Sequence, residues 1–178
     1  MSKAESFDLA VIGAGPGGYS AAIHAAHRGM KVAIVEKDTR LGGTCLLRGC
    51  IPTKALLHSA DLYSEVKSGA EHGIVVSELS LAFDKVMARK DKIVTKNAKG
   101  VEFLMRKNKI TVFNGFGRLD GKRRVAVEAG GDTKSLEVAN VILATGSVPR
   151  VLPGINIDGK RILTSDEILE LKELPKSL

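Results

Sequence analysis

The sequence has few cysteines, few aromatic residues and no long hydrophobic run. Two of its 178 residues are cysteine, and 4% are aromatic. A transmembrane helix needs about 20 consecutive apolar residues, and no run approaches that length, so we expect no membrane-spanning segment. A secreted domain stapled by disulfides would use more than two cysteines. The hydrophobic and charged fractions, 44% and 26%, are ordinary for a globular domain with its own core.

The amino terminus does not have the features of a secretory signal. Met1–Asp8 contains the charged side chains of Lys3, Glu5 and Asp8 and no apolar stretch. A signal peptide needs an apolar segment of about 7 to 15 residues. We therefore predict a cytoplasmic protein, or a mitochondrial matrix protein without its presequence.

Positive charge exceeds negative charge, and the excess is concentrated in one stretch. The net charge is +7, and nine lysines and arginines lie from Lys85 to Lys109. Such a cluster can bind nucleic acid, but Phe103 is the one aromatic ring in it, so bases would find no stacking platform. Asp91 and Glu102 interrupt the run. We interpret it as the solvated face of a long helix and expect no nucleic-acid partner.

The first 36 residues carry the pattern of a β-α-β unit. Apolar runs at Phe7–Gly13 and Lys31–Glu36 predict two buried strands. The alanine-rich segment Pro16–Gly29 between them predicts a helix that ends at a glycine. Two such strands joined by a helix imply a parallel sheet with a right-handed crossover.

The remaining chain predicts more helices and a group of shorter strands. The expected elements are a glycine-rich loop at 41–50, a helix from near Pro52 toward Ser68, a long helix at 83–107, strands at 110–113, 123–129 and 135–144 with turns at 115–122 and 130–132, a buried strand end at 140–145, and a short helix from about Ser165 to Leu171. The predicted fold class is α/β: a Rossmann-like domain with a parallel sheet and a small antiparallel β insertion.

Three glycines follow the first strand at a spacing typical of dinucleotide-binding sites. Gly13, Gly15 and Gly18 form a Gly-x-Gly-x-x-Gly motif that opens the first helix. The first glycine permits a tight turn, the second leaves room for a pyrophosphate, and the third allows the helix to pack closely. The helix amino terminus attracts phosphate. Glu36, 18 residues after Gly18, can accept hydrogen bonds from a ribose. The alternative is a packing turn with a surface glutamate, and the motif alone does not distinguish FAD from NAD.

Cys45 and Cys50 lie five residues apart, just before Pro52 and Lys54. Five residues of ideal helix turn through about 500°, so a disulfide between these cysteines needs a distorted helix start, which Gly49 permits. Closing so small a ring would contribute only about 2 kcal/mol, so a purely structural bond would be a poor device. Small or strained exposed disulfides are the labile ones. The pair is therefore predicted to be redox-active.

A metal site is the other alternative for the two cysteines. It would need two further ligands, and His58 is the one close candidate. The spacing matches no common zinc pattern, so we predict no metal site. His24, His27 and His72 are interpreted, like His58, as surface or packing residues.

The segment Gly42–Leu57, GGTCLLRGCIPTKALL, resembles the active-site segment of the pyridine nucleotide–disulfide oxidoreductases. AEHGI at 70–74, ARKDK at 88–92 and ATGSVPRVLPG at 144–154 are also similar, and the resemblance covers essentially the whole chain. Within the family, IPTKALLH at 51–58 is most similar to the dihydrolipoamide dehydrogenases. Leu47–Arg48 departs from the usual Asn followed by a small apolar residue or Arg, a difference that bears on the substrate rather than on the redox chemistry.

The resemblance implies a role for each site residue. Cys45 would be the interchange thiol that meets the substrate, Cys50 the thiol against the flavin, and Lys54 a neighbour that tunes the flavin. Residues 36–45 would line the adenosine and pyrophosphate, with Thr44 near the phosphates. Gly117 would contact adenine through its backbone, and residues 144–146 would form a second FAD contact. The expected FAD-binding residues are Gly13, Gly15, Gly18, Glu36, Lys37, Gly42, Gly43, Thr44, Cys45, Lys54, Gly117, Ala144, Thr145 and Gly146.

The resemblance also implies an activity and its partners. A dihydrolipoamide dithiol would attack Cys45, the Cys45–Cys50 pair would be reduced, and electrons would pass through FAD to NAD. Implied partners are lipoyl groups of 2-oxo acid dehydrogenase complexes or of the glycine cleavage system, and a second copy in a homodimer. Alternatives are glutathione or mercuric reductase, or a nucleotide-binding module without turnover.

The resemblance implies a domain division as well. Residues 1–150 would be the first part of an FAD-binding domain carrying the redox disulfide, and 151–178 a connector toward an NAD-binding domain. Beyond the motif that ends this chain, the family continues into an NAD-binding motif and a dimerisation domain with a catalytic His–Glu pair. We find no counterpart of these segments in the 178 residues and expect the chain to be incomplete relative to the family and inactive alone.

Overall fold

The computed structural model describes residues 5–178, so Met1–Ala4, which entered the prediction about signal peptides, lie outside the described residues. The described chain forms two compact units. The first comprises the amino-terminal segment to Leu46 together with 97–148, and the second comprises 47–96 and 149–178. Among the described helices, none is long and apolar enough to cross a membrane.

The first unit is built on one six-stranded sheet with the order β3-β2-β1-β6-β5-β4. Its strands are β1 (Glu5–Ile12), β2 (Val32–Glu36), β3 (Thr111–Asn114), β4 (Phe116–Leu119), β5 (Arg124–Ala129) and β6 (Asp132–Leu143). The β3-β2-β1-β6 pairs are parallel, and the β6-β5-β4 pairs are antiparallel. The predicted α/β fold with a parallel sheet and an antiparallel insertion is therefore confirmed.

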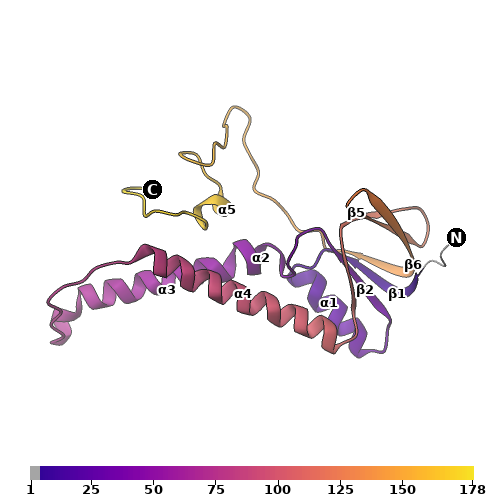
Figure 1. Ribbon diagram of the computed structural model, residues 1–178, viewed down its shortest axis with the longest axis horizontal. Coiled ribbons are helices and arrows are strands. Elements are labelled where there is room, and N and C mark those ends of the chain that lie inside the picture. Colours follow the sequence, from indigo (N-terminus) through magenta and orange to yellow (C-terminus); the bar gives the residue numbers. More distant parts are fainter. Residues whose placement is uncertain (1–4) are drawn as a thin grey trace. The chain divides into compact units, whose positions relative to one another are not determined.

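The β-α-β unit at the start of the chain forms as predicted. Helix α1 (Pro16–His27) follows β1 and packs on β1 and β2 (Figure 1). Gly29 turns the chain back after the helix. Its φ of +81° lies in the left-handed region, which residues with a side chain rarely adopt. Leu9 then pairs with Val32 in parallel register, and all five residues of β2 are buried. Burial on both faces explains why this strand has a continuous apolar run instead of an alternating one.

The core of the first unit joins the parallel and antiparallel parts of the sheet. Three residues of β1 form one cluster with alternate residues of β2, β5 and β6. Its buried members are Phe7, Ala10, Ile12, Ala33, Val35, Val125, Val127, Leu136 and Val138. Phe7 and Phe113 meet edge to face with ring centroids 5.8 Å apart. The antiparallel strands are therefore part of the core.

The second unit contains α3 (Cys50–Lys67), a short 3-10 helix η1 (Gly69–His72) and the first half of α4 (Phe83–Lys107). The predicted bounds of the long helix, 83–107, match α4. Lys90 of α4 is 1% exposed, yet its ammonium is fully engaged. It donates to the carbonyl oxygen of Leu169 at 2.7 Å and pairs with carboxylates of Asp91 and Glu170 at 2.9 and 3.1 Å. Hydrogen bonds of this kind are what allow a lysine to be buried.

The segment 149–178 is mostly irregular and contains one helical turn, α5 (Ser165–Ile168). Thr164 and Glu167 form a capping box at this turn. The Thr164 side chain accepts a hydrogen bond from the Asp166 amide. The backbone amide and the hydroxyl of Thr164 both donate to the Glu167 carboxylate. The two hydrogen bonds from Thr164 lower the pKa of the Glu167 carboxyl, and the one from the hydroxyl has the larger effect. A short helix at this place was predicted, and it is three residues shorter than expected.

Three local predictions are wrong. The loop predicted at 41–50 contains a helix, α2 (Gly43–Arg48), whereas the helix predicted from near Pro52 toward Ser68 is confirmed as α3 (Cys50–Lys67). The turn predicted at 115–122 contains strand β4, which pairs with β5. The strand end predicted to be buried at 140–145 is mostly exposed, with Leu143 61% accessible.

Candidate dinucleotide site and cysteine pair

The glycine turn after β1 packs directly against the chain that follows β6. The Gly13 amide donates to the carbonyl oxygen of Val35 at 2.8 Å, and the Ala144 amide donates to that of Ile12 at 2.8 Å. A Cβ placed on Gly13 would lie 2.2 Å from the carbonyl oxygen of Ala144. Gly13 also has φ +102°, which an L side chain rarely adopts. The close approach of these two backbones therefore requires glycine at position 13.

A second glycine segment covers the first. A Cβ on Gly43 would lie 2.4 Å from the Cα of Gly15. The Gly42 amide donates to the carbonyl oxygen of Ala14 at 3.0 Å and so ties the two loops together. The two glycine loops thus lie against each other at the carboxyl ends of parallel strands, where open α/β sheets bind their ligands.

Helix α1 begins at this surface in a form suited to an anion. Its N-cap is Gly15, which offers no side-chain cap, and Pro16 follows it. No acidic residue stands in the first turn. The amino-terminal N–H groups and the positive end of the helix dipole are therefore not neutralised by the helix's own side chains, an arrangement that attracts phosphate.

Glu36, at the carboxyl end of β2, turns its carboxylate toward the glycine turn. One carboxylate oxygen accepts from the Ala14 amide at 2.7 Å, and the other accepts from the Asp38 amide at 3.0 Å. The side chain is buried, with 7% of its surface exposed. Each oxygen has a second lone pair, so the carboxylate can still accept hydrogen bonds from ribose hydroxyls. Sequence reasoning missed Ala14, because its bond to Glu36 depends on the backbone amide and not on its side chain.

Replacing Glu36 by alanine is expected to destabilise the fold and weaken nucleotide binding together. The buried Ala14 amide would lose its acceptor, at a cost of about 1–3 kcal/mol in the free energy of unfolding. Urea denaturation and flavin content of the purified protein measure the two effects. Glu137→Ala, which removes an exposed carboxylate from β6, is the matched control. Unchanged stability in Glu36→Ala would contradict this interpretation.

The other expected FAD-binding residues of the first unit lie around the same loops. Gly117 of β4 lies against β1 and β2, because a Cβ on it would be 2.9 Å from a methyl carbon of Val35 and 3.0 Å from one of Ile12. Gly18 is buried in α1. Lys37, Thr44, Thr145 and Gly146 are exposed. Apart from Lys37, these residues present backbone and small side chains, which is the surface that a pyrophosphate and ribose require.

The two cysteines lie on consecutive helices on either side of Gly49. Cys45 is half-buried in α2, and Cys50 is the exposed first residue of α3. No disulfide bond joins the two sulfurs in this structure. Gly49, with φ −144° and ψ −113°, breaks the helical path between them. The predicted distortion at the helix start is thus present, while the pairing of Cys45 with Cys50 stays a prediction.

Cys50 and Lys54 share one face of α3. They are four residues apart in a continuous helix, and both are exposed. Pro52 and Ala55, on another face, are buried. The face of α3 with Pro52 and Ala55 is therefore packed, and the face with the Cys50 thiol and the Lys54 ammonium is exposed. No group of three or more histidine, cysteine or acidic side chains within residues 5–178 is arranged to hold a metal ion.

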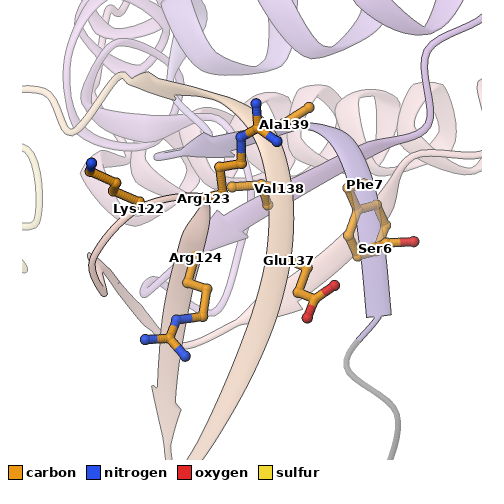
Figure 2. Close-up of a pocket in the computed structure, with 8 residues that line it drawn as sticks. All are labelled: Ser6, Phe7, Lys122, Arg123, Arg124, Glu137, Val138 and Ala139. Atoms are coloured by element: carbon orange, nitrogen blue, oxygen red, sulfur yellow. The ribbon is translucent and has the colours of Figure 1, made fainter.

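A hollow of about 500 Å³ lies elsewhere on the first unit. Figure 2 shows its lining residues, among them Ser6 and Phe7 from the amino end of β1, with Lys122 and Arg124 pointing in different directions. The glycine turn follows the carboxyl end of the same strand, so this hollow is not the dinucleotide site. The diverging basic side chains do not converge on one ligand.

Comparison with protein families identifies the family of this chain. The model of the family described as pyridine nucleotide-disulphide oxidoreductase matches residues 7–178. This chain belongs to the pyridine nucleotide-disulphide oxidoreductase family. The family is one of oxidoreductase enzymes and implies FAD as cofactor, with NAD in the full enzyme. The close-packed glycines Gly13, Gly15 and Gly43 fit such a dinucleotide.

Several curated proteins resemble this member of the family over nearly all of its length. Dihydrolipoyl dehydrogenase of Chlorobaculum parvum is 52% identical over 178 residues, which cover 99% of this chain and 38% of the relative. Dihydrolipoyl dehydrogenase of Bacillus subtilis is 47% identical, covering 98% and 39%. Leghemoglobin reductase of Glycine max is 44% identical, covering 99% and 34%. The chain thus spans a little over a third of the length of these relatives.

Proposed function

We propose that this protein is a flavin-dependent dihydrolipoyl dehydrogenase, which oxidises dihydrolipoamide to lipoamide with NAD as the final acceptor. The observation that carries the proposal is the segment 42–50: its first glycines cover the Gly13–Gly15 turn, and its two cysteines follow at a broken helix start. The names of the dihydrolipoyl dehydrogenase relatives support the choice of substrate.

The chain's own residues would hold FAD by its adenosine and pyrophosphate. The backbone at Gly13, Gly15 and Gly43 would receive the pyrophosphate at the start of α1, where the dipole end is uncapped. Glu36 would accept from the adenosine ribose while it continues to hold the Ala14 amide. Thr44 and residues 144–146 would line the remainder. When bound, FAD supplies the electron transfer between the dithiol and the nicotinamide.

The cysteine chemistry is a thiol–disulfide exchange. A thiolate of the substrate attacks Cys45 and breaks the proposed Cys45–Cys50 bond, releasing the Cys50 thiolate. The second substrate thiolate then attacks the mixed disulfide, which forms lipoamide and leaves both cysteines reduced. Two electrons and two protons pass from one dithiol to the protein, so the step balances. Lys54, on the Cys50 face of α3, places a positive charge beside the emerging thiolate.

The remaining assignments are part of the same proposal. Residues 1–150 are the first part of the FAD-binding domain, and 151–178 are the connector toward an NAD-binding domain. The partners are lipoyl groups of 2-oxo acid dehydrogenase complexes or of the glycine cleavage system, and a second copy of the chain. The compartment is the cytoplasm or the mitochondrial matrix.

The test compares substrates on the protein in its full length. We expect NADH to form from NAD with dihydrolipoamide, and much slower turnover with NADPH and either glutathione disulfide or mercuric ion. Faster turnover with either of the last two would reassign the enzyme within the family. A purified protein without flavin absorbance would overturn the proposal altogether and favour a nucleotide-binding module.

A further inference from the structure

In the second unit, an arginine of α4 contacts the helix that carries Cys50. The guanidinium of Arg89 donates to the carbonyl oxygen of Ala55 at 2.8 Å and lies 3.4 Å from the Ser59 hydroxyl (α3 and α4 in Figure 1). The Ser59 hydroxyl itself donates to the same carbonyl at 3.3 Å. Ala55 and Ser59 are one helical turn apart inside α3, where this carbonyl also receives a backbone N–H.

Extra donors on a carbonyl in the middle of a helix have a directional effect. A side-chain donor that engages a carbonyl of the helical ladder bends or tilts that turn. A donor that carries a full charge acts more strongly than a neutral hydroxyl. Arg89 therefore ties the Ala55–Ser59 turn of α3 to α4.

The turn that Arg89 holds directly follows the proposed redox residues. Ala55 is next to Lys54 and five residues after Cys50, about 7.5 Å along the helix axis. Ala55 is 7% exposed, while Cys50 and Lys54 are on the exposed face. A small rotation of this turn about the helix axis would change the direction in which the thiol and the ammonium project.

Arg89 is itself fixed by its neighbour. The next residue, Lys90, is buried and holds the Leu169 carbonyl and two carboxylates. The backbone of α4 at this point is therefore anchored within the second unit. Arg89 thus projects from a point of α4 that is tied to Leu169 and Glu170, and such support is what a residue needs in order to hold another helix in place.

We propose that Arg89 is a positioning residue. By holding the Ala55–Ser59 turn of α3, it sets the direction from which Cys50 and Lys54, in the turn before, approach their reaction partners. The inference rests on the proposed function, because it assigns Cys50 to thiol–disulfide exchange. Arg89 does not touch the reacting sulfurs in this role. It acts through the Ala55 carbonyl, by its charge and its hydrogen bond together.

The experiment compares Arg89→Met with Arg89→Lys in the full-length protein. Anaerobic rapid mixing with dihydrolipoamide gives the rate of cysteine-pair reduction and its substrate dependence. We expect Arg89→Met to lower the saturating rate about five- to ten-fold, since small misplacements of reacting groups cost rate, with half-saturation unchanged. Arg89→Lys keeps the charge and one donor and should recover at least half of the rate. Lys92→Met removes an exposed charge from the same helix and should react like the wild type.

A second readout needs no substrate. The protein is first reduced anaerobically with a phosphine and freed of it, and the rate at which iodoacetamide then labels Cys50 is followed by mass spectrometry. This rate should differ between Arg89→Met and the wild type and should be restored in Arg89→Lys. If the wild type is not reduced by dihydrolipoamide, the proposed function fails, and this labelling still decides the role of Arg89. The inference is overturned if iodoacetamide labels Cys50 of Arg89→Met at the wild-type rate. It is also overturned if Arg89→Met and Arg89→Lys label at the same rate and share the same lowered melting temperature, because the effect would then be general destabilisation.

Discussion

Replacing Cys50 by serine is expected to lower dihydrolipoamide oxidation about 10³-fold or more, because a hydroxyl cannot form or break a disulfide. Cys45→Ser should have an equally large effect, since exchange needs both sulfurs. The fold should survive, because Cys50 is exposed and Cys45 is half-buried. Steady-state NADH formation and flavin content of the full-length variants measure loss of chemistry separately from loss of cofactor.

The control for the cysteine variants lies on the same helix. Asp61→Asn changes an exposed side chain of α3 about three turns beyond Cys50 and should leave turnover within two-fold of the wild type. Turnover by Cys50→Ser within ten-fold of the wild type would mean that electrons reach the acceptor without this sulfur. The proposed role of the cysteine pair would then be wrong.

The second large effect is expected in the glycine turn. A Cβ on Gly18 would lie 1.8 Å from the carbonyl oxygen of Gly13 and 2.9 Å from its carbonyl carbon. Both are backbone atoms, so α1 must move away from the turn to admit even a methyl group. We expect Gly18→Ala to lose about 3 kcal/mol of unfolding free energy, at the upper end of overpacking effects, and most of its flavin.

Gly17 provides a matched control one residue earlier. A Cβ there would meet nothing within 4 Å, and Gly17 lies in the same helix. Alanine is a better helix former than glycine by up to about 1 kcal/mol, so Gly17→Ala should be as stable as the wild type or slightly more so. Urea denaturation of the two variants makes the comparison. Equal stability of Gly17→Ala and Gly18→Ala would refute the close approach seen in the structure.

Much of the fold follows from local pattern alone. The bounds of α4 could be predicted because apolar residues recur at helical spacing over seven turns, with charged residues elsewhere. The β-α-β unit could be predicted because two continuous apolar runs flank an alanine-rich helix that ends at Gly29. These signals lie within the segments themselves and need no knowledge of distant partners.

The elements that the sequence did not predict depend on contacts between distant segments. Strand β4 is four residues long and contains a glycine, and it forms because Phe116–Leu119 pairs with β5. Helix α2 begins with glycine and forms around Leu46, whose side chain packs so closely on Gly42 that a Cβ there would lie 2.9 Å from it. Apolar residues at 142–143 predicted burial, but an apolar pattern cannot reveal whether another layer covers it.

The candidate site divides in the same way. The spacing of Gly13, Gly15 and Gly18 predicted a nucleotide turn, and the structure brings Gly13 to Ala144 and Gly15 to Gly43. The hydrogen bond from the Ala14 amide to Glu36 was not predictable, because backbone amides leave no mark in a sequence. The contact of Arg89 with Ala55 was likewise hidden, since a lysine- and arginine-rich helix indicates only a solvated face.

The central claim is that a dithiol substrate reduces Cys45 and Cys50 as a pair beside a bound flavin. The most direct measurement is anaerobic addition of one equivalent of dihydrolipoamide to the oxidised, full-length protein, followed by alkylation and peptide mass mapping. We predict that Cys45 and Cys50 both acquire the label only after the dithiol is added. Labelling of both cysteines to the same extent without dithiol, or of neither with it, would contradict the account.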